Sequence, residues 1–60
     1  MKMYVEIEGL NVKCNNQQQT DCVIAKCKTL GLTYQVFTEE EIFGQSPWEV
    51  PAKEWLSINS

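Results

Sequence analysis

The stretch from residue 20 to residue 37 constrains the fold more than any other, because it predicts a helix, a stop and a strand in succession. Thr20 or Asp21 can cap the start of this helix by accepting a hydrogen bond from a backbone N–H. Gly31 can adopt the left-handed conformation that ends a helix. Apolar side chains recur at the spacings that define one helical face: Val23, Ile24, Cys27 and Leu30.

The residues after Gly31 predict a strand followed by a second helix start. Two sets of side chains alternate with the period of a strand, Leu32, Tyr34 and Val36 against Thr33, Gln35 and Phe37. Residues 38–41 then form a capping box, because Thr38 and Glu41 can each accept the other's backbone N–H. We expect a short helix from there through Phe43, closed by Gly44.

Residues 3–14 predict a β-hairpin, since apolar residues occupy every second position on either side of a glycine. We expect a two-residue turn at Gly9 and Leu10, a register that places Ile7 opposite Val12.

A second interpretation of this region keeps only residues 2–8 as a strand and treats 9–18 as a loop. In either case residues 15–20 are polar and are expected to form a linker turn, with Gln17 or Gln18 as an alternative start of the helix.

The C-terminal part of the chain leaves one choice open. Residues 45–51 predict an extended loop, because residues that precede proline avoid the helical region. Its two prolines would restrict Trp48, either as a core plug or as an exposed anchor for another protein. Residues 51–60 fit a helix that begins at Pro51 or a strand over 55–58.

The composition argues against several classes of function. Sixty residues make one domain, near the lower limit for folding without a metal, disulfides or a partner. The net charge of −3 divides into +1 over residues 1–37 and −4 over 38–60. Arginine and histidine are absent from the sequence, which argues against nucleic-acid binding and metal ligation, and we expect no cofactor. No apolar run approaches the roughly 20 residues that span a bilayer, so no membrane span is expected.

The three cysteines cannot all pair within the chain. Because the N-terminus alternates charged and apolar residues, unlike a signal peptide, reduced thiols in the cytoplasm are expected. Cys27 lies on the apolar helix face and is expected in the core. Cys22 is expected in the first helical turn, where we favour inert packing; if its side chain is exposed, the helix dipole would lower its thiol pKa.

Several short motifs follow one another in a fixed order: Ala25-Lys26, Leu30-Gly31-Leu32, Tyr34, Val36 and Val50-Pro51. In this order they resemble the glutaredoxin family of the thioredoxin fold, over about half of the chain. The resemblance implies a βαβ unit and a cis proline at Pro51. It matches Cys22 with the family's second cysteine and Gln19 with the first, nucleophilic one. It therefore implies a shared scaffold more than shared thiol exchange.

These observations predict a single small α+β domain over residues 1–60. They favour an acidic, non-catalytic module that binds or inhibits a larger protein partner, for which a basic surface would be complementary. The alternative is a thiol–disulfide oxidoreductase that uses Cys22 with Cys14 or Cys27. A homo-oligomer is also left open. The candidate binding residues are Trp48, Pro51, Glu39 and Glu40.

Overall fold

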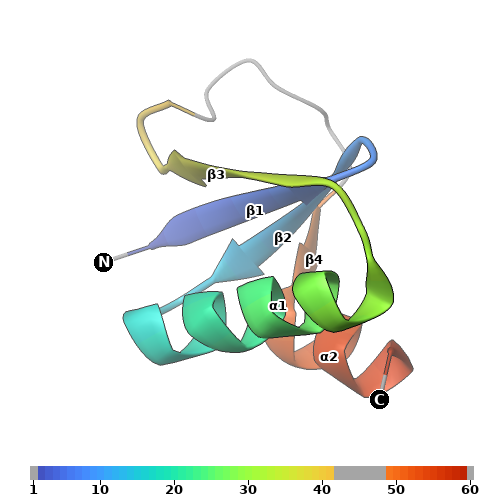
Figure 1. Cartoon of the computed structure of the whole chain (residues 1–60). Coiled ribbons are helices and arrows are strands. Elements are labelled where there is room, and N and C mark those ends of the chain that lie inside the picture. The colour runs from blue at the N-terminus through green and yellow to red at the C-terminus, as the bar shows by residue number, and fades with distance from the viewer. Residues whose placement is uncertain (1, 42–48, 60) are drawn as a thin grey trace.

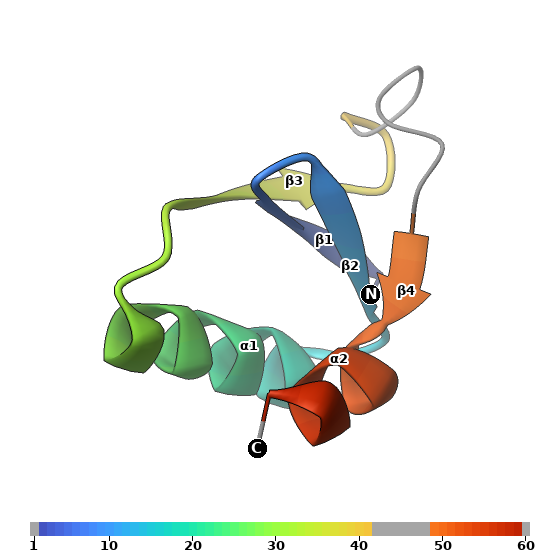
Figure 2. The same ribbon diagram turned by 90° about the vertical axis from the view of Figure 1, so that its right-hand side faces the viewer.

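The computed structural model describes residues 2–41 and 49–59. The strands make one sheet in the order β3-β1-β2-β4, and both helices cover the same face of it (Figures 1 and 2). The domain is therefore α+β, as predicted. The elements follow the chain in the order β1 (Met3–Ile7), β2 (Leu10–Cys14), α1 (Gln17–Leu30), β3 (Tyr34–Thr38), β4 (Glu49–Pro51) and α2 (Ala52–Ile58).

The topology places β3 and β4 at the two edges of the sheet. β1 is antiparallel to both β2 and β3, so β2 and β3 run parallel to each other, with β1 between them. α1 connects these two parallel strands and completes a split βαβ unit. The described residues contain no cis peptide bond. The cis proline that the glutaredoxin resemblance implies at Pro51 is therefore wrong, and this proline instead precedes α2 as its N-cap.

The hairpin is confirmed over the single-strand alternative, but the expected register is wrong by two residues. The turn consists of Glu8 and Gly9, and Ile7 pairs with Leu10 rather than with Val12. Both turn residues have positive φ, 50° at Glu8 and 90° at Gly9, as a type I′ turn requires. That turn is favoured because its twist matches the twist of the flanking strands. A shift of two residues leaves every side chain on its expected face.

α1 begins earlier than the predicted caps. Asn16 is the N-cap, and its side chain accepts a 2.8 Å hydrogen bond from the N–H of Gln19. Thr20 is instead a buried residue within the helix, and its hydroxyl donates to the carbonyl of Asn16 over 3.0 Å. Asp21 also lies within the helix. The helix ends as predicted at Gly31, which has φ of 72° and whose N–H donates to carbonyls of the last turn.

The core lies between the sheet and the helix layer. Leu30, expected on the apolar helix face, is 46% exposed, because the last turn of α1 extends past the β1–β2 hairpin (Figure 2). The buried face of α1 instead begins at Thr20, one turn before Val23. The buried members of the core cluster are Val5, Ile7, Val12, Cys14, Val23, Cys27, Ala52 and Trp55.

The C-terminal residues form a helix, which excludes the alternative of a strand over 55–58. Ala52 and Trp55 are buried, and Leu56 is half-buried against the core. The side-chain amide of Asn59 donates to the carbonyl of Trp55 over 2.8 Å at the end of the helix.

The capping box after β3 is confirmed. The N–H of Thr38 donates to Oε1 of Glu41 over 3.0 Å, and the N–H of Glu41 donates to Oγ1 of Thr38 over 3.3 Å. The backbone and side-chain hydrogen bonds with Thr38 hold the pKa of Glu41 below its usual value. The predicted helix through Phe43, its closure at Gly44, and Trp48 lie outside the described residues.

Candidate functional site

The two edges of the sheet differ in how easily they could accept another strand. β4 has three residues and contains a proline and the charged Glu49. β3 has five residues, Tyr-Gln-Val-Phe-Thr, with neither a proline nor a charge. Short length, proline and charge are the features by which proteins block sheet edges against pairing. β3 is therefore the open edge, and no second neighbour of β3 exists among the described strands.

The register determines which backbone groups β1 directs toward β3. In a hairpin with a two-residue turn, the flanking residues Ile7 and Leu10 form a hydrogen-bonded pair. Hydrogen-bonded and non-hydrogen-bonded pairs alternate along an antiparallel ladder. Tyr4 and Glu6 therefore direct their backbone N–H and C=O groups away from β2 and toward β3.

The same alternation identifies the backbone groups that face outward from β3. Tyr4 pairs with Phe37 and Glu6 pairs with Gln35, so these two residues of β3 turn their backbone groups to β1. The other residues of β3 direct their backbone N–H and C=O groups to the outer edge, where a further strand could pair. These residues are Tyr34, Val36 and Thr38.

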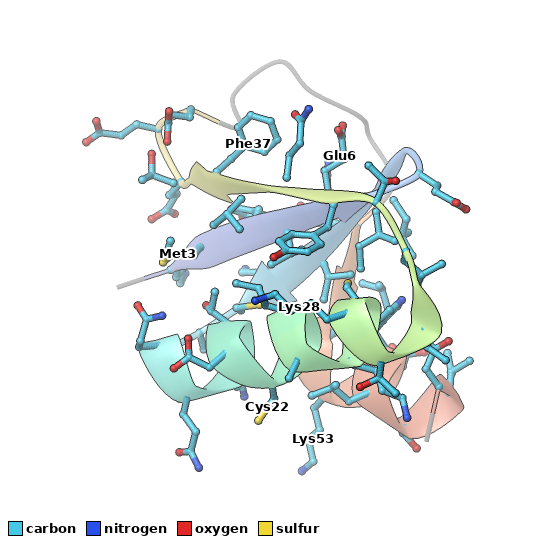
Figure 3. All side chains as sticks on the ribbon, in the orientation of Figure 1. Met3, Glu6, Cys22, Lys28, Phe37 and Lys53 are labelled. Carbon is cyan, nitrogen blue, oxygen red and sulfur yellow. The ribbon has the colours of Figure 1, made fainter. Side chains whose placement is uncertain are left out.

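Apolar side chains of β3 are accessible on both faces of the sheet. Val36 pairs with the core residue Val5, faces the helix layer and is 37% exposed. Phe37 is half-buried and lies on the face away from the helices, as does Glu6 (Figure 3). A strand added at this edge would therefore gain apolar contacts beside its backbone hydrogen bonds.

Carboxylates lie at both ends of β3. At its start is a surface depression of about 210 Å³, and at its end is a second one of about 250 Å³. The first contains two glutamates, and the second contains two glutamates and one lysine. The lining residues are Glu6, Glu8, Gly9, Thr33, Tyr34 and Gln35 at the start, and Lys2, Thr38, Glu39 and Glu40 at the end.

The acidic character extends over the face of the sheet that the helices leave open. Tyr4 is buried on this face, and burial raises the pKa of its phenol. The negative charges of Glu49 and Glu39 raise that pKa further, and the positive charge of Lys2 opposes them. The Tyr4 side chain therefore stays neutral at physiological pH, and the charge of this face comes from the carboxylates and lysines around it.

Charge is divided unequally between the two layers of the domain. The strands and their connecting turns, together with Lys2 just before β1, carry six glutamates and two lysines, for a net charge of −4. The two helices carry three lysines and two acidic residues, for a net charge of +1. Lys53 projects from the helix layer away from the sheet (Figure 3). The sheet layer is therefore the part of the molecule that would attract a positively charged ligand.

The binding residues chosen from the sequence do not form one site. Glu39 and Glu40 are exposed directly after β3 and line the depression at its end. Pro51 is exposed but belongs to β4, at the other edge of the sheet. Trp48 lies outside the described residues.

The three cysteines are free and occupy different environments. Cys14 and Cys27 are buried in the core, and burial raises the pKa of both thiols; the side chain of Thr20 partly offsets this for Cys14. Cys22 is exposed and points away from the sheet (Figure 3). It lies in the second turn of α1, so its expected place in the first turn is wrong. Because Cys22 points away from the core that holds Cys14 and Cys27, the geometry does not assemble the alternative redox pair.

We expect iodoacetamide to alkylate Cys22 rapidly, whereas Cys14 and Cys27 should react only when the domain opens. Burial restricts access to these two thiols and, by raising their pKa, lowers the fraction of reactive thiolate. Peptide mapping by mass spectrometry after timed alkylation measures each rate, and the same reaction in denaturant is the control. Equal rates at the three cysteines in the native protein would contradict the placement of the core.

The open edge of β3 was not identified from the sequence. The signal was present, because residues 34–38 contain no charge and no proline, whereas residues 49–51 contain both. Strand order was the missing information, since an uncharged strand is equally suited to the middle of a sheet.

Among residues 2–41 and 49–59, no three side chains of the types that ligate metals gather closely enough to hold an ion. Within the same residues, neither helix is long and apolar enough to cross a membrane. Comparison of the chain with protein-family models, with curated proteins and with solved structures finds no significant match.

Proposed function

We propose that this chain is a small non-catalytic module that binds a larger protein, and thereby inhibits or recruits it, by pairing β3 with an extended segment of that partner. The observation that carries the proposal is the contrast between a blocked edge at β4 and an open edge at β3. Addition of a strand to an open sheet edge is an established mode of peptide recognition, in which main-chain hydrogen bonds supply affinity and side chains supply specificity.

The size of the domain supports a role in association. Its largest fully buried side chains are three valines, and among the buried described residues of the core cluster only Trp55 is aromatic. A partner that binds only the folded state would add to the stability of such a domain by mass action. The outward backbone groups of Tyr34, Val36 and Thr38 offer that partner three consecutive pairing positions on one edge.

The scaffold and the compartment belong to the same proposal. The order of short motifs supports a glutaredoxin-like scaffold, without the cis proline of that family and with β1 lying between the two strands that α1 connects. Three free thiols, two of them in the core, support a reducing compartment such as the cytoplasm.

Selection of peptides against the immobilised chain tests the proposal. Enriched sequences are synthesised, labelled and titrated with the wild type and with the Val36→Pro variant, which lacks the central outward N–H of β3. We expect extended sequences rich in β-branched residues. Their affinity should fall about tenfold with Val36→Pro, because one hydrogen bond is lost and its partner carbonyl is left unpaired.

Ile58→Ala is the matched control, because Ile58 is 72% exposed on α2, in the other layer of the molecule. Its affinity for each peptide should equal that of the wild type. Failure to enrich any peptide, or equal affinities for the wild type and Val36→Pro, would overturn the proposal.

A further inference from the structure

We infer that the segment bound by β3 is basic at both ends: an extended stretch with an uncharged, alternating centre flanked by lysine or arginine. The inference rests on the proposed function and specifies the chemistry of the partner. It follows from the charges at the two ends of the strand and from the exposed side chain at its centre.

The ends of β3 set the spacing of the basic residues. A paired segment would run alongside the five residues of β3, which span about 17 Å, and would reach both depressions. At one end its side chains would reach across β3 toward Glu6 and Glu8, which lie on β1 and in the β1–β2 turn, and at the other end they would meet Glu39 and Glu40. Basic residues about five or six positions apart would therefore each lie near a pair of carboxylates. Lys2 also lines the second depression and reduces its net negative charge.

The centre of β3 specifies what lies between the basic ends. A residue directly opposite Val36 would share its face of the sheet, and an apolar side chain there would cover the exposed part of Val36. The flanking residues of the segment would lie on the other face, near Gln35 and Phe37, where uncharged polar side chains fit. The expected segment therefore alternates apolar and polar residues between its basic ends.

The same charges oppose a second copy of this chain as the occupant. Two β3 strands paired antiparallel about Val36 would place Glu39 and Glu40 of each copy opposite Thr33 and Leu32 of the other. Thr33 lines the depression that contains Glu6 and Glu8. Like charges would thus approach at both ends of the pair, which destabilises it. A basic segment replaces both repulsions by attractions.

A set of designed peptides tests the inference. The probe has about nine residues, with a Val-Thr-Val-Thr-Val centre that places valine opposite Val36 and two lysines at each end, and it is acetylated, amidated and labelled with fluorescein. Its counterparts carry glutamate or glutamine in place of lysine. Fluorescence anisotropy measures the binding of each peptide at low and at high salt.

We expect the lysine peptide to bind at least about tenfold more tightly than the glutamate peptide, because each exposed ion pair changes affinity by about two- to fivefold. The difference should shrink at high salt. A variant with Glu39→Gln and Glu40→Gln should weaken binding of the lysine peptide several-fold. The matched control is Glu54→Gln, which removes a carboxylate from the exposed face of α2, in the other layer, and should leave the affinity unchanged.

The outcomes separate this inference from the proposed function. If the three peptides bind with equal affinity and Val36→Pro weakens the binding of each, the inference of a basic partner is overturned and the proposal of edge pairing is retained. Binding of the lysine peptide that Val36→Pro leaves unchanged would overturn the inference, because the attraction would then not depend on β3. Concentration-dependent dimers in sedimentation that Val36→Pro abolishes would identify a second copy as the occupant and overturn the basic partner.

Discussion

Replacing Trp55 by alanine is expected to remove a large part of the free energy of unfolding of this domain. Trp55 is 5% exposed and is the largest side chain of the core cluster. Removal of a buried tryptophan costs about 3–5 kcal/mol, which combines the lost transfer free energy with the cavity left behind. A domain of this length has a free energy of unfolding of about 3–9 kcal/mol. One substitution would therefore remove a large part of the total.

The effect should be large because α2 joins several parts of the fold. α2 packs against α1, β2 and β4, so the indole of Trp55 helps to fix both the helix layer and the short edge strand. The other buried members of the core cluster are aliphatic, alanine or cysteine, and none of them can expand to fill a cavity of indole size.

Urea denaturation followed by circular dichroism in the far ultraviolet measures the effect of Trp55→Ala. This signal reports backbone structure and does not depend on the tryptophan that is removed. Ile58→Ala on the same helix is the control, because a side chain that is 72% exposed should change the free energy of unfolding by about 0.5 kcal/mol or less. A loss of less than about 1 kcal/mol for Trp55→Ala would contradict its place in the core.

Sequence patterns predicted the local elements well where one physical effect decides the outcome. The alternation of residues 3–14 predicted the hairpin, and Gly31 predicted the end of α1, because positive φ excludes most other residues. At the C-terminus, the spacing of Ala52 and Trp55 fits a helix. These features depend on neighbours in the chain and require no knowledge of the tertiary fold.

The errors arose where local effects compete or where distant elements decide. Asn16, Thr20 and Asp21 are all suitable caps, and the fold selects Asn16 because Thr20 is needed on the buried face. Leu30 matches the apolar period but lies beyond the hairpin, which no helical spacing can reveal. The open edge of β3 depends on strand order, and that order is set by packing of the whole sheet.

Two proline substitutions in adjacent residues of β3 should have very different effects on stability. Gln35 directs its N–H to β1, so Gln35→Pro removes a ladder hydrogen bond and leaves a carbonyl of Glu6 without its donor. We expect this variant to lose about 2–3 kcal/mol. Val36 directs its N–H to the outer edge, where proline is tolerated, so Val36→Pro should lose about 1 kcal/mol or less.

The comparison tests the geometry on which the proposed binding mode depends. Gln35→Ala and Val36→Ala are the matched controls, because each removes the side chain and keeps the N–H. Denaturant titrations of the four variants give the cost of each proline relative to its alanine control. If Val36→Pro were the more damaging of the two, the backbone groups of Val36 would pair with β1, and the outward positions would be Gln35 and Phe37. The larger cost at Gln35 would mean that Val36→Pro removes a binding hydrogen bond from an otherwise intact sheet, which is what its use in the peptide titrations requires.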